Sequence, residues 1–187
     1  MNGKLLILSG PSGVGKDTII DAWHSLNPLV KRVVATTTRE RRQNEVDGIH
    51  YNFVTAEQFQ NHIDAGDFLE YKKVHNNWYA TPKKTVESLL LKGHIAVLKI
   101  DVQGALEVMK AMPHALSVFL LPPDKQSLEH RIRNRGTESE ESIQERLANA
   151  QDELALAHCY GFQIVNESIQ ECVQELERIS CEVEEMA

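Results

Sequence analysis

The sequence predicts an α/β protein in which helices flank a parallel sheet, with a small α+β insert and a helical lid. Two observations lead to this fold class. Short apolar runs at 5–9, 94–101, 115–122 and 162–166 alternate with stretches of helical periodicity. A glycine-rich segment, GPSGVGKDT at 10–18, joins the first run to the first helical stretch. Strands that are separated by helices are usually parallel and covered on both faces, so we expect a sheet between two helical layers.

The first strand, loop and helix form the opening of a βαβ unit. LLILS at 5–9 is an apolar run that Gly-Pro ends, which is typical of a buried strand. The stretch at 16–26 places its apolar residues at helical spacing: Ile19, Ile20, Trp23 and Leu26. Further helices are expected after the later strands, at 102–113, 124–136 and 139–158, and in the C-terminal segment.

Residues 33–82 interrupt this alternation. VVATTT (33–38), HYNFV (50–54) and FLEYKKV (68–74) have the composition of strands, and AEQFQNHIDAG (56–66) has the pattern of one short helix. We therefore expect a small α+β insert at 33–82 within the α/β core.

Length and composition are those of one globular domain, 1–187, with 42% hydrophobic residues and a formal charge of −7. The acidic balance argues against nucleic-acid binding. The first apolar run is too short for a signal peptide and no apolar run reaches the length of a membrane span, so we expect a cytoplasmic protein without a membrane partner. The same location is expected from three cysteines without CxxC spacing, Cys159, Cys172 and Cys181. The eight histidines show no zinc-binding pattern.

The glycine-rich segment meets the phosphate-loop pattern GxxxxGK with Gly10, Gly15 and Lys16. Glycines allow backbone N–H groups to converge on a phosphate, the helix adds its positive N-terminal end, and the lysine reaches the terminal phosphates. The next residue is usually Ser or Thr, whose hydroxyl binds magnesium. Here it is Asp17, followed by Thr18.

Five further segments complete a pattern that resembles the guanylate kinase family along roughly residues 4–180. They are TTTRERRQNEVDGIHYNFV (36–54), FLEYKKVHNNWYATP (68–82), IDVQGA (100–105), RGTESEESIQERL (135–147) and IVNE (164–167). The resemblance implies transfer of the γ-phosphoryl group of ATP to GMP or deoxy-GMP, giving ADP and GDP in purine nucleotide metabolism.

The resemblance also implies a division of the chain and a cofactor. The P-loop kinase core would comprise 1–32, 83–135 and 151–187, the GMP-binding insert 33–82, and the lid 136–150. Magnesium would accompany ATP, with Asp17 and Thr18 as its protein ligands. The oligomeric state is left open.

Site residues are carried over by position. The ATP site would comprise Gly10, Pro11, Ser12, Gly13, Val14, Gly15, Lys16, Asp17, Thr18 and Asn166, the last of these being alternatively a turn residue after a strand. The GMP site would comprise Ala35, Arg39, Arg42, Tyr51, Glu70, Tyr79, Thr81 and Asp101. The catalytic cations would be Lys16, Arg39, Arg131, Arg135 and Arg146, whereas Arg133 is expected to be a surface residue. Arginine forks suit phosphate, and carboxylates suit the N1–H and 2-amino donors of guanine.

Three positions depart from the family pattern. Asp17 replaces the hydroxyl residue, Lys99 stands where the family usually has an Asp, and Ala35 stands where many members have a Ser that contacts guanine. We favour the interpretation that Asp17 binds magnesium and Lys99 offsets its charge. Alternatively, the two changes are independent and Thr18 keeps the metal role.

Two other functions are compatible with parts of the sequence. The Lys-Asp pair that ends the loop also occurs in ribose 1,5-bisphosphate phosphokinases of the same fold, although such an acceptor requires neither Glu70 nor Tyr51. A non-catalytic guanylate-kinase-like interaction module would have lost the loop, which is present here.

Overall fold

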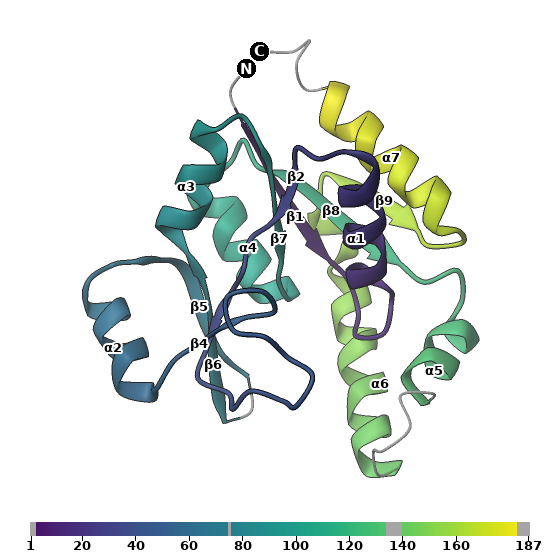
Figure 1. Cartoon of the computed structure of the whole chain (residues 1–187). Helices are drawn as coiled ribbons and strands as arrows, with labels where there is room; N and C mark the ends of the chain where they lie inside the picture. Colours follow the sequence, from purple (N-terminus) through teal and green to yellow (C-terminus); the bar gives the residue numbers. More distant parts are fainter. Residues whose placement is uncertain (1–2, 75, 134–139, 183–187) are drawn as a thin grey trace.

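Figure 1 shows the computed structural model, which describes residues 3–74, 76–133 and 140–182. Its main sheet is parallel and has the strand order β2-β7-β1-β8-β9. The strands are β1 (Lys4–Ser9), β2 (Val30–Arg32), β7 (Ile95–Lys99), β8 (Leu116–Leu121) and β9 (Phe162–Val165). The expected parallel sheet is therefore confirmed, and β1, which leads into the phosphate loop, is its central strand.

Helices cover both faces of this sheet (Figure 1). They are α1 (Lys16–Leu26) and α7 (Ile169–Glu182) on one face and α3 (Lys83–Leu91) and α4 (Val102–Ala111) on the other. Helices α5 (Lys125–Arg133) and α6 (Glu140–Ala155) pack against each other in a third, smaller cluster. Successive side chains of β1 point to opposite faces. Leu6 and Leu8 pack in one core with α1 and α7, and Leu5 and Ile7 pack in a second core with α3 and α4.

A second sheet is formed by residues of the expected insert, in the order β4-β3-β6-β5. Its strands are β3 (Thr36–Thr37), β4 (Asn52–Phe53), β5 (Phe68–Val74) and β6 (Asn77–Pro82), and its helix is α2 (Ala56–Asp64). Thr55 and Gln58 form a capping box that starts α2. The buried Phe59 ring stacks on Trp78, which holds the helix against the hairpin β5–β6.

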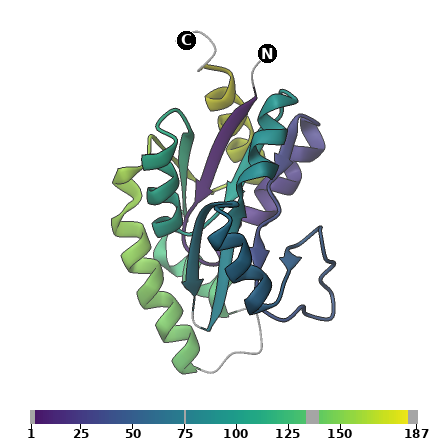
Figure 2. The same cartoon turned by 90° about the vertical axis from the view of Figure 1, so that its left-hand side faces the viewer.

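The insert and the pair α5–α6 lie on either side of the edge where the parallel strands end (Figure 1). Figure 2 shows α6 extending well beyond this edge. Carboxyl ends of parallel strands are the usual place for a ligand in an open α/β sheet. Within the described residues, no helix combines the length and the apolar character that crossing a membrane requires.

The structure corrects several details of the predicted elements. VVATTT is not one strand: the Val33 N–H still donates to Val97 of the main sheet, and the chain then crosses to the insert and resumes as β3 at Thr36. Strands β2 and β6 and helix α3 were not predicted as elements. The helix expected at 139–158 ends at Ala155, and a 3₁₀ turn (Ala157–Cys159) follows.

Candidate active site

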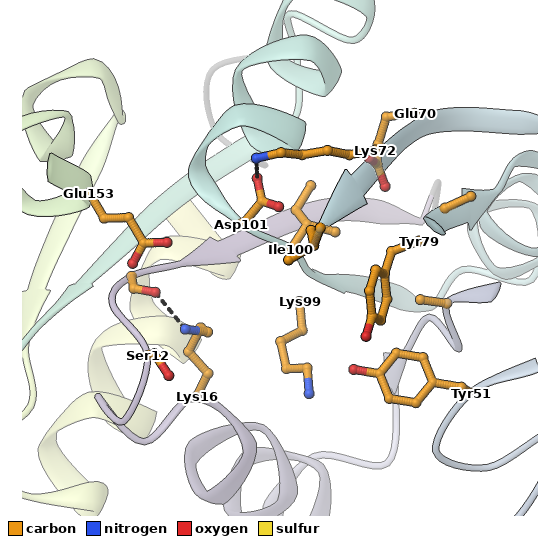
Figure 3. A pocket seen from close by; sticks show the side chains of 14 residues that line it. Ser12, Lys16, Tyr51, Glu70, Lys72, Tyr79, Lys99, Ile100, Asp101 and Glu153 are labelled. Atoms are coloured by element: carbon orange, nitrogen blue, oxygen red, sulfur yellow. Dashed lines mark hydrogen bonds and ion pairs between the residues drawn. The ribbon is translucent and has the colours of Figure 1, made fainter. Parts of the chain in front are cut away.

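A pocket of about 380 Å³ lies where the phosphate loop, the insert and α6 meet (Figure 3). It is lined by loop residues, insert residues and residues at the end of β7: Gly10, Ser12, Lys16, Ala35, Tyr51, Glu70, Lys72, Val74, Tyr79, Ala80, Lys99, Ile100, Asp101 and Glu153. Residues of both predicted nucleotide sites therefore share one cavity.

The phosphate loop leads directly into helix α1. Gly15 is the N-cap residue with φ 105°, and Gly10 has φ 141°. A Cβ at Gly10 would lie 2.4 Å from the Leu120 carbonyl oxygen, so only glycine fits beside β8. The Lys16 ammonium is turned back onto the loop, where it donates to the carbonyl oxygens of Gly10 at 2.5 Å and Pro11 at 3.1 Å.

Three predicted side chains gather on the same loop. Arg131 donates to the Val14 carbonyl oxygen at 3.1 Å, and Arg146 donates to the Ser12 hydroxyl at 2.7 Å. Asn166 is buried, and its amide donates to the Val14 carbonyl oxygen at 2.6 Å. Asn166 therefore fixes the loop to the end of β9. The predicted catalytic residue Arg135 lies outside the described residues.

Asp17 and Lys99, the two charged departures from the family pattern, form an ion pair. The Lys99 Nζ atom is 2.8 Å from Asp17 Oδ1, and an Arg32 guanidinium nitrogen is 2.9 Å from the same oxygen. Burial opposes ionisation of Asp17, but Lys99 and Arg32 outweigh it and lower the pKa of this carboxyl. Thr18 is exposed in the first turn of α1.

Two tyrosines of the insert, Tyr51 and Tyr79, line the pocket, and Arg39 lies beside the first of them. The rings of Tyr51 and Tyr79 contact edge to face with centroids 5.9 Å apart, and the Arg39 guanidinium lies 5.5 Å from the centre of the Tyr51 ring. Arg39 is paired with Glu45, with an N–O distance of 2.7 Å. This hydrogen bond lowers the pKa of Glu45 to about 2. Arg42 has an exposed side chain, and its backbone N–H also donates to Glu45.

Glu70 and Thr81 form the buried polar end of the pocket. Glu70 is 8% exposed, and the Thr81 hydroxyl donates to its Oε1 atom at 2.6 Å. Burial raises the pKa of Glu70 to about 7, because desolvation outweighs this hydrogen bond. Asp101 is the N-cap of α4 and accepts from the backbone N–H groups of Gln103 at 2.9 Å and Gly104 at 3.0 Å. A Cβ at Gly104 would lie 2.9 Å from Glu70 Oε2, so α4 packs tightly against this carboxylate.

Two charged residues that the sequence did not single out, Lys72 and Glu153, also line the pocket. Lys72 lies two positions after Glu70 on β5, hence on the same face, and its ammonium is 3.3 Å from Asp101 Oδ1. The alternation within FLEYKKV was a usable signal for it. Glu153 comes from α6, and burial raises its pKa although Lys16 is nearby. No local pattern in the sequence marked this glutamate.

The fold and the pocket together define a P-loop phosphotransferase with a second, acidic ligand site beside its phosphate loop. The family model described as "Guanylate kinase" matches residues 2–182. The chain belongs to the guanylate kinase family.

Similar proteins support this assignment along nearly the whole chain. A guanylate kinase of Gloeobacter violaceus is 45% identical over 94% of this chain and 86% of its own length. One of Carboxydothermus hydrogenoformans is 41% identical over 95% of this chain and 87% of its own. The crystal structure of guanylate kinase from Anaplasma phagocytophilum has a TM-score of 0.78 at 31% identity, covering 100% of this chain and 88% of that one.

One further structural neighbour shares the fold alone. The SH3-kinase fragment of tight junction protein 3 has a TM-score of 0.52 at 13% identity, and it covers 95% of this chain and 56% of that one.

Proposed function

We propose that this protein transfers the γ-phosphoryl group of ATP to GMP or deoxy-GMP. In this reaction the bond between the γ-phosphorus and the β–γ bridging oxygen breaks, and a phosphate oxygen of GMP forms the new bond, giving ADP and GDP. The observation that carries the proposal is one pocket shared by the phosphate-loop lysine Lys16 and the buried carboxylate Glu70. Phosphoryl transfer needs mainly positioning and positive charge, which such a pocket provides.

The acidic end of the pocket supports guanine as the acceptor base. Ionised Glu70 and Asp101 accept hydrogen bonds, which suits the N1–H and 2-amino donors of guanine, whereas adenine lacks this donor pair. Thr81 keeps Glu70 oriented at 2.6 Å. We assign the GMP phosphate to Tyr51, Tyr79, Arg39 and Arg42, and Ala35 to van der Waals contact with the base.

The loop end of the pocket supports ATP binding. Backbone N–H groups of the loop and the N-terminus of α1 would bind the phosphates, and Lys16, Arg131, Arg135 and Arg146 would neutralise their charge. Asn166 supports the loop at 2.6 Å. We propose the division into core, insert (33–82) and lid (136–150) because closure of the last two would exclude water, the competing acceptor.

Magnesium fits this site only together with nucleotide. No group of three or more His, Cys, Asp or Glu residues that could hold a metal is found in the part of the chain that the structure describes. Kinase magnesium ions are held largely by phosphates and water with one or two protein oxygens. Lys99 and Arg32 both reach Asp17 at its Oδ1 atom, at 2.8 Å and 2.9 Å. We propose Asp17 and the Thr18 hydroxyl as these ligands, and the ion would neutralise phosphate charge.

Location and partners follow from the substrates. We infer a cytoplasmic enzyme whose partners are ATP and GMP, and we propose no role for nucleic acid. The free thiols of Cys159, Cys172 and Cys181 are consistent with a reducing compartment.

The test is a coupled assay of ADP formation with GMP, AMP, UMP and ribose 1,5-bisphosphate as alternative acceptors. We expect turnover with GMP that exceeds turnover with AMP and UMP by at least about 100-fold, because the buried Glu70 carboxylate would lack the donors of guanine. Equal rates with GMP and AMP would refute guanine selection, and preferential turnover of ribose 1,5-bisphosphate would favour the related phosphokinase. Absence of ADP formation with every acceptor would favour an interaction module.

A further inference from the structure

Lys99 is the last residue of β7, and its side chain enters the middle of the pocket. In Figure 3 its ammonium lies between Lys16 of the phosphate loop and the hydroxyls of Tyr51 and Tyr79. In the proposed function the γ-phosphate of ATP lies near Lys16 and the phosphate of GMP lies near the two tyrosines. Lys99 therefore lies where the two nucleotides would meet.

Asp17, which does not line the pocket, forms an ion pair with this ammonium. The Lys99–Asp17 distance is 2.8 Å, and Arg32 of the neighbouring strand β2 reaches the same carboxylate oxygen at 2.9 Å. The three side chains come from β7, α1 and β2. Arg32 also pairs with Asp21 at 3.1 Å, so the four side chains are formally neutral, and Asp17 adds no net negative charge beside the loop.

A structural role alone explains this cluster poorly. The Asp17 side chain is 54% exposed, and ion pairs with an exposed partner contribute little to stability. Lysine also differs from arginine in having a flexible stem and a compact charge that can be redirected among several oxygens. A phosphate entering the pocket would compete with Asp17 for the Lys99 ammonium, and the pocket walls would shield that contact from solvent.

We propose that Lys99 is a phosphate-contacting catalytic residue of this chain, and that Asp17 is its positioning residue. This inference rests on the proposed function. Lys99 reduces the repulsion between the ATP and GMP phosphates and follows the phosphoryl group as it moves from one to the other. It gains and loses no proton in the step, so the balance is that of the transfer itself.

The position of Lys99 between the two subsites predicts a specific effect on ligand binding. A cation between two phosphates matters most when both are present, because that is when the repulsion is largest. Removal of the Lys99 charge should therefore weaken a ligand that fills both subsites far more than it weakens ATP or GMP alone. If Lys99 lay in only one subsite, removal of its charge would instead weaken the binding of one nucleotide by itself.

The test is isothermal titration calorimetry with a bisubstrate analogue, adenosine and guanosine joined by five phosphates, and with ATP and GMP separately. Each titration is run in EDTA and again in magnesium. We expect Lys99→Met to weaken the analogue by about 10- to 100-fold, the effect of one charge-assisted hydrogen bond, and each single nucleotide by less than about threefold. Lys99→Arg should restore most of the analogue's affinity. Lys110→Met, on the exposed face of α4, removes the same charge away from the pocket and should leave all three affinities unchanged.

Asp17 is tested in the same titrations. If Asp17 positions Lys99, Asp17→Asn should weaken binding of the analogue in EDTA. In a chain that already carries Lys99→Met, Asp17→Asn should weaken it little further. Unchanged analogue binding by Lys99→Met would overturn the assignment of Lys99. An effect of Asp17→Asn that is seen only in magnesium would overturn the positioning role. The proposed function fails separately, if the unmodified protein does not phosphorylate GMP.

Discussion

The cationic side chains on the loop side of the pocket and on its insert side have different hydrogen-bond partners. On the loop side, Lys16 and Arg131 donate to backbone carbonyl oxygens and Arg146 donates to a hydroxyl. On the insert side, Arg39 is paired with the carboxylate of Glu45 at 2.7 Å. Each of these loop contacts is to a neutral oxygen, whereas the contact of Arg39 with Glu45 is to an anion.

This difference bears on what each ligand must displace. A phosphate that approaches the loop competes with these neutral acceptors for cationic donors, and the attraction between opposite charges favours the phosphate. A phosphate that approaches Arg39 must compete with an existing ion pair. Binding on the insert side therefore requires an exchange of charged partners.

The largest effect is expected for Lys16→Met, which tests the loop side of the pocket. We expect kcat to fall by about 10³-fold, because a single preorganised charge at the transferring phosphate contributes this order of rate. The measurement is turnover of GMP in the coupled assay, with Lys110→Met as the matched charge control. A fall in kcat of less than about tenfold would show that the loop does not depend on its lysine, and it would contradict the contrast between the two sides of the pocket.

The buried acid of the insert half is tested by Glu70→Gln. We expect kcat/KM for GMP to fall by about 10- to 150-fold, the range for a hydrogen bond to a charged group, and the gap to AMP to narrow. The pKa of Glu70 is about 7, and the ionised form is the acceptor. GMP affinity of the unmodified protein should therefore rise from pH 6 to pH 8. A pH profile that Glu70→Gln leaves unchanged would assign the titration to another group.

The same carboxyl should make stability depend on pH. Its pKa is raised from 4.5 to about 7 in the folded state, so the folded state binds more protons than the unfolded state between these values. Its stabilising contribution is present below pH 4.5 and is lost as pH rises through 7, by up to about 3 kcal/mol. Urea unfolding at pH 5 and pH 8 should show this loss relative to Glu70→Gln. A parallel pH dependence in both proteins would contradict it.

The exchange of partners at Arg39 is tested by Glu45→Gln, which removes the charge and keeps one of the two acceptor oxygens. We expect the KM for GMP to fall by up to about fivefold, as when a partly exposed ion pair is no longer broken on binding. Glu40→Gln in the same exposed loop is the control. A higher KM in Glu45→Gln would mean that Glu45 orients Arg39 for the phosphate and does not compete with it.

The smallest effect is expected for Arg133→Ala. Arg133 is exposed and pairs with Glu129 and Glu140 on the helix surface. Turnover should stay within about twofold of the unmodified rate. Arg131→Ala on the same helix should lower turnover by about 10²-fold, because the Arg131 guanidinium donates to the loop carbonyl of Val14. Similar losses in both variants would show that the helix, and not the individual guanidinium, is what the site needs.

Contiguous motifs made the loop half predictable from the sequence. GxxxxGK follows a run of apolar residues and precedes a helical period, and α1 begins and ends where that period predicts, at Lys16 and Leu26. Strand β5 likewise has the predicted bounds, Phe68–Val74. In both cases the local pattern and the tertiary environment favour the same structure.

The remaining elements and site contacts depend on tertiary interactions that no local sequence pattern encodes. Strand β2 has only three residues, two of them charged, and it is defined by its pairing with β7. Helix α3 follows Pro82 without a side-chain cap, so its start lacks a sequence signal. The insert-side residues come from separate strands and from the segments that connect them, and only the family resemblance grouped them. The pairing of Asp17 with Lys99 joins positions 82 residues apart and became visible only in three dimensions.

The contact between Asn166 and Val14 has a consequence for the newly synthesised chain. The loop is synthesised before β7 and β8, which flank β1, and it is fixed by a side chain 152 residues further on. Such distant contacts form only after most of the loop-closure entropy has been lost. The phosphate-loop end of the pocket is therefore completed only after Asn166 has been synthesised. A prematurely terminated chain that carries the full phosphate-loop sequence would lack the residue that shapes it.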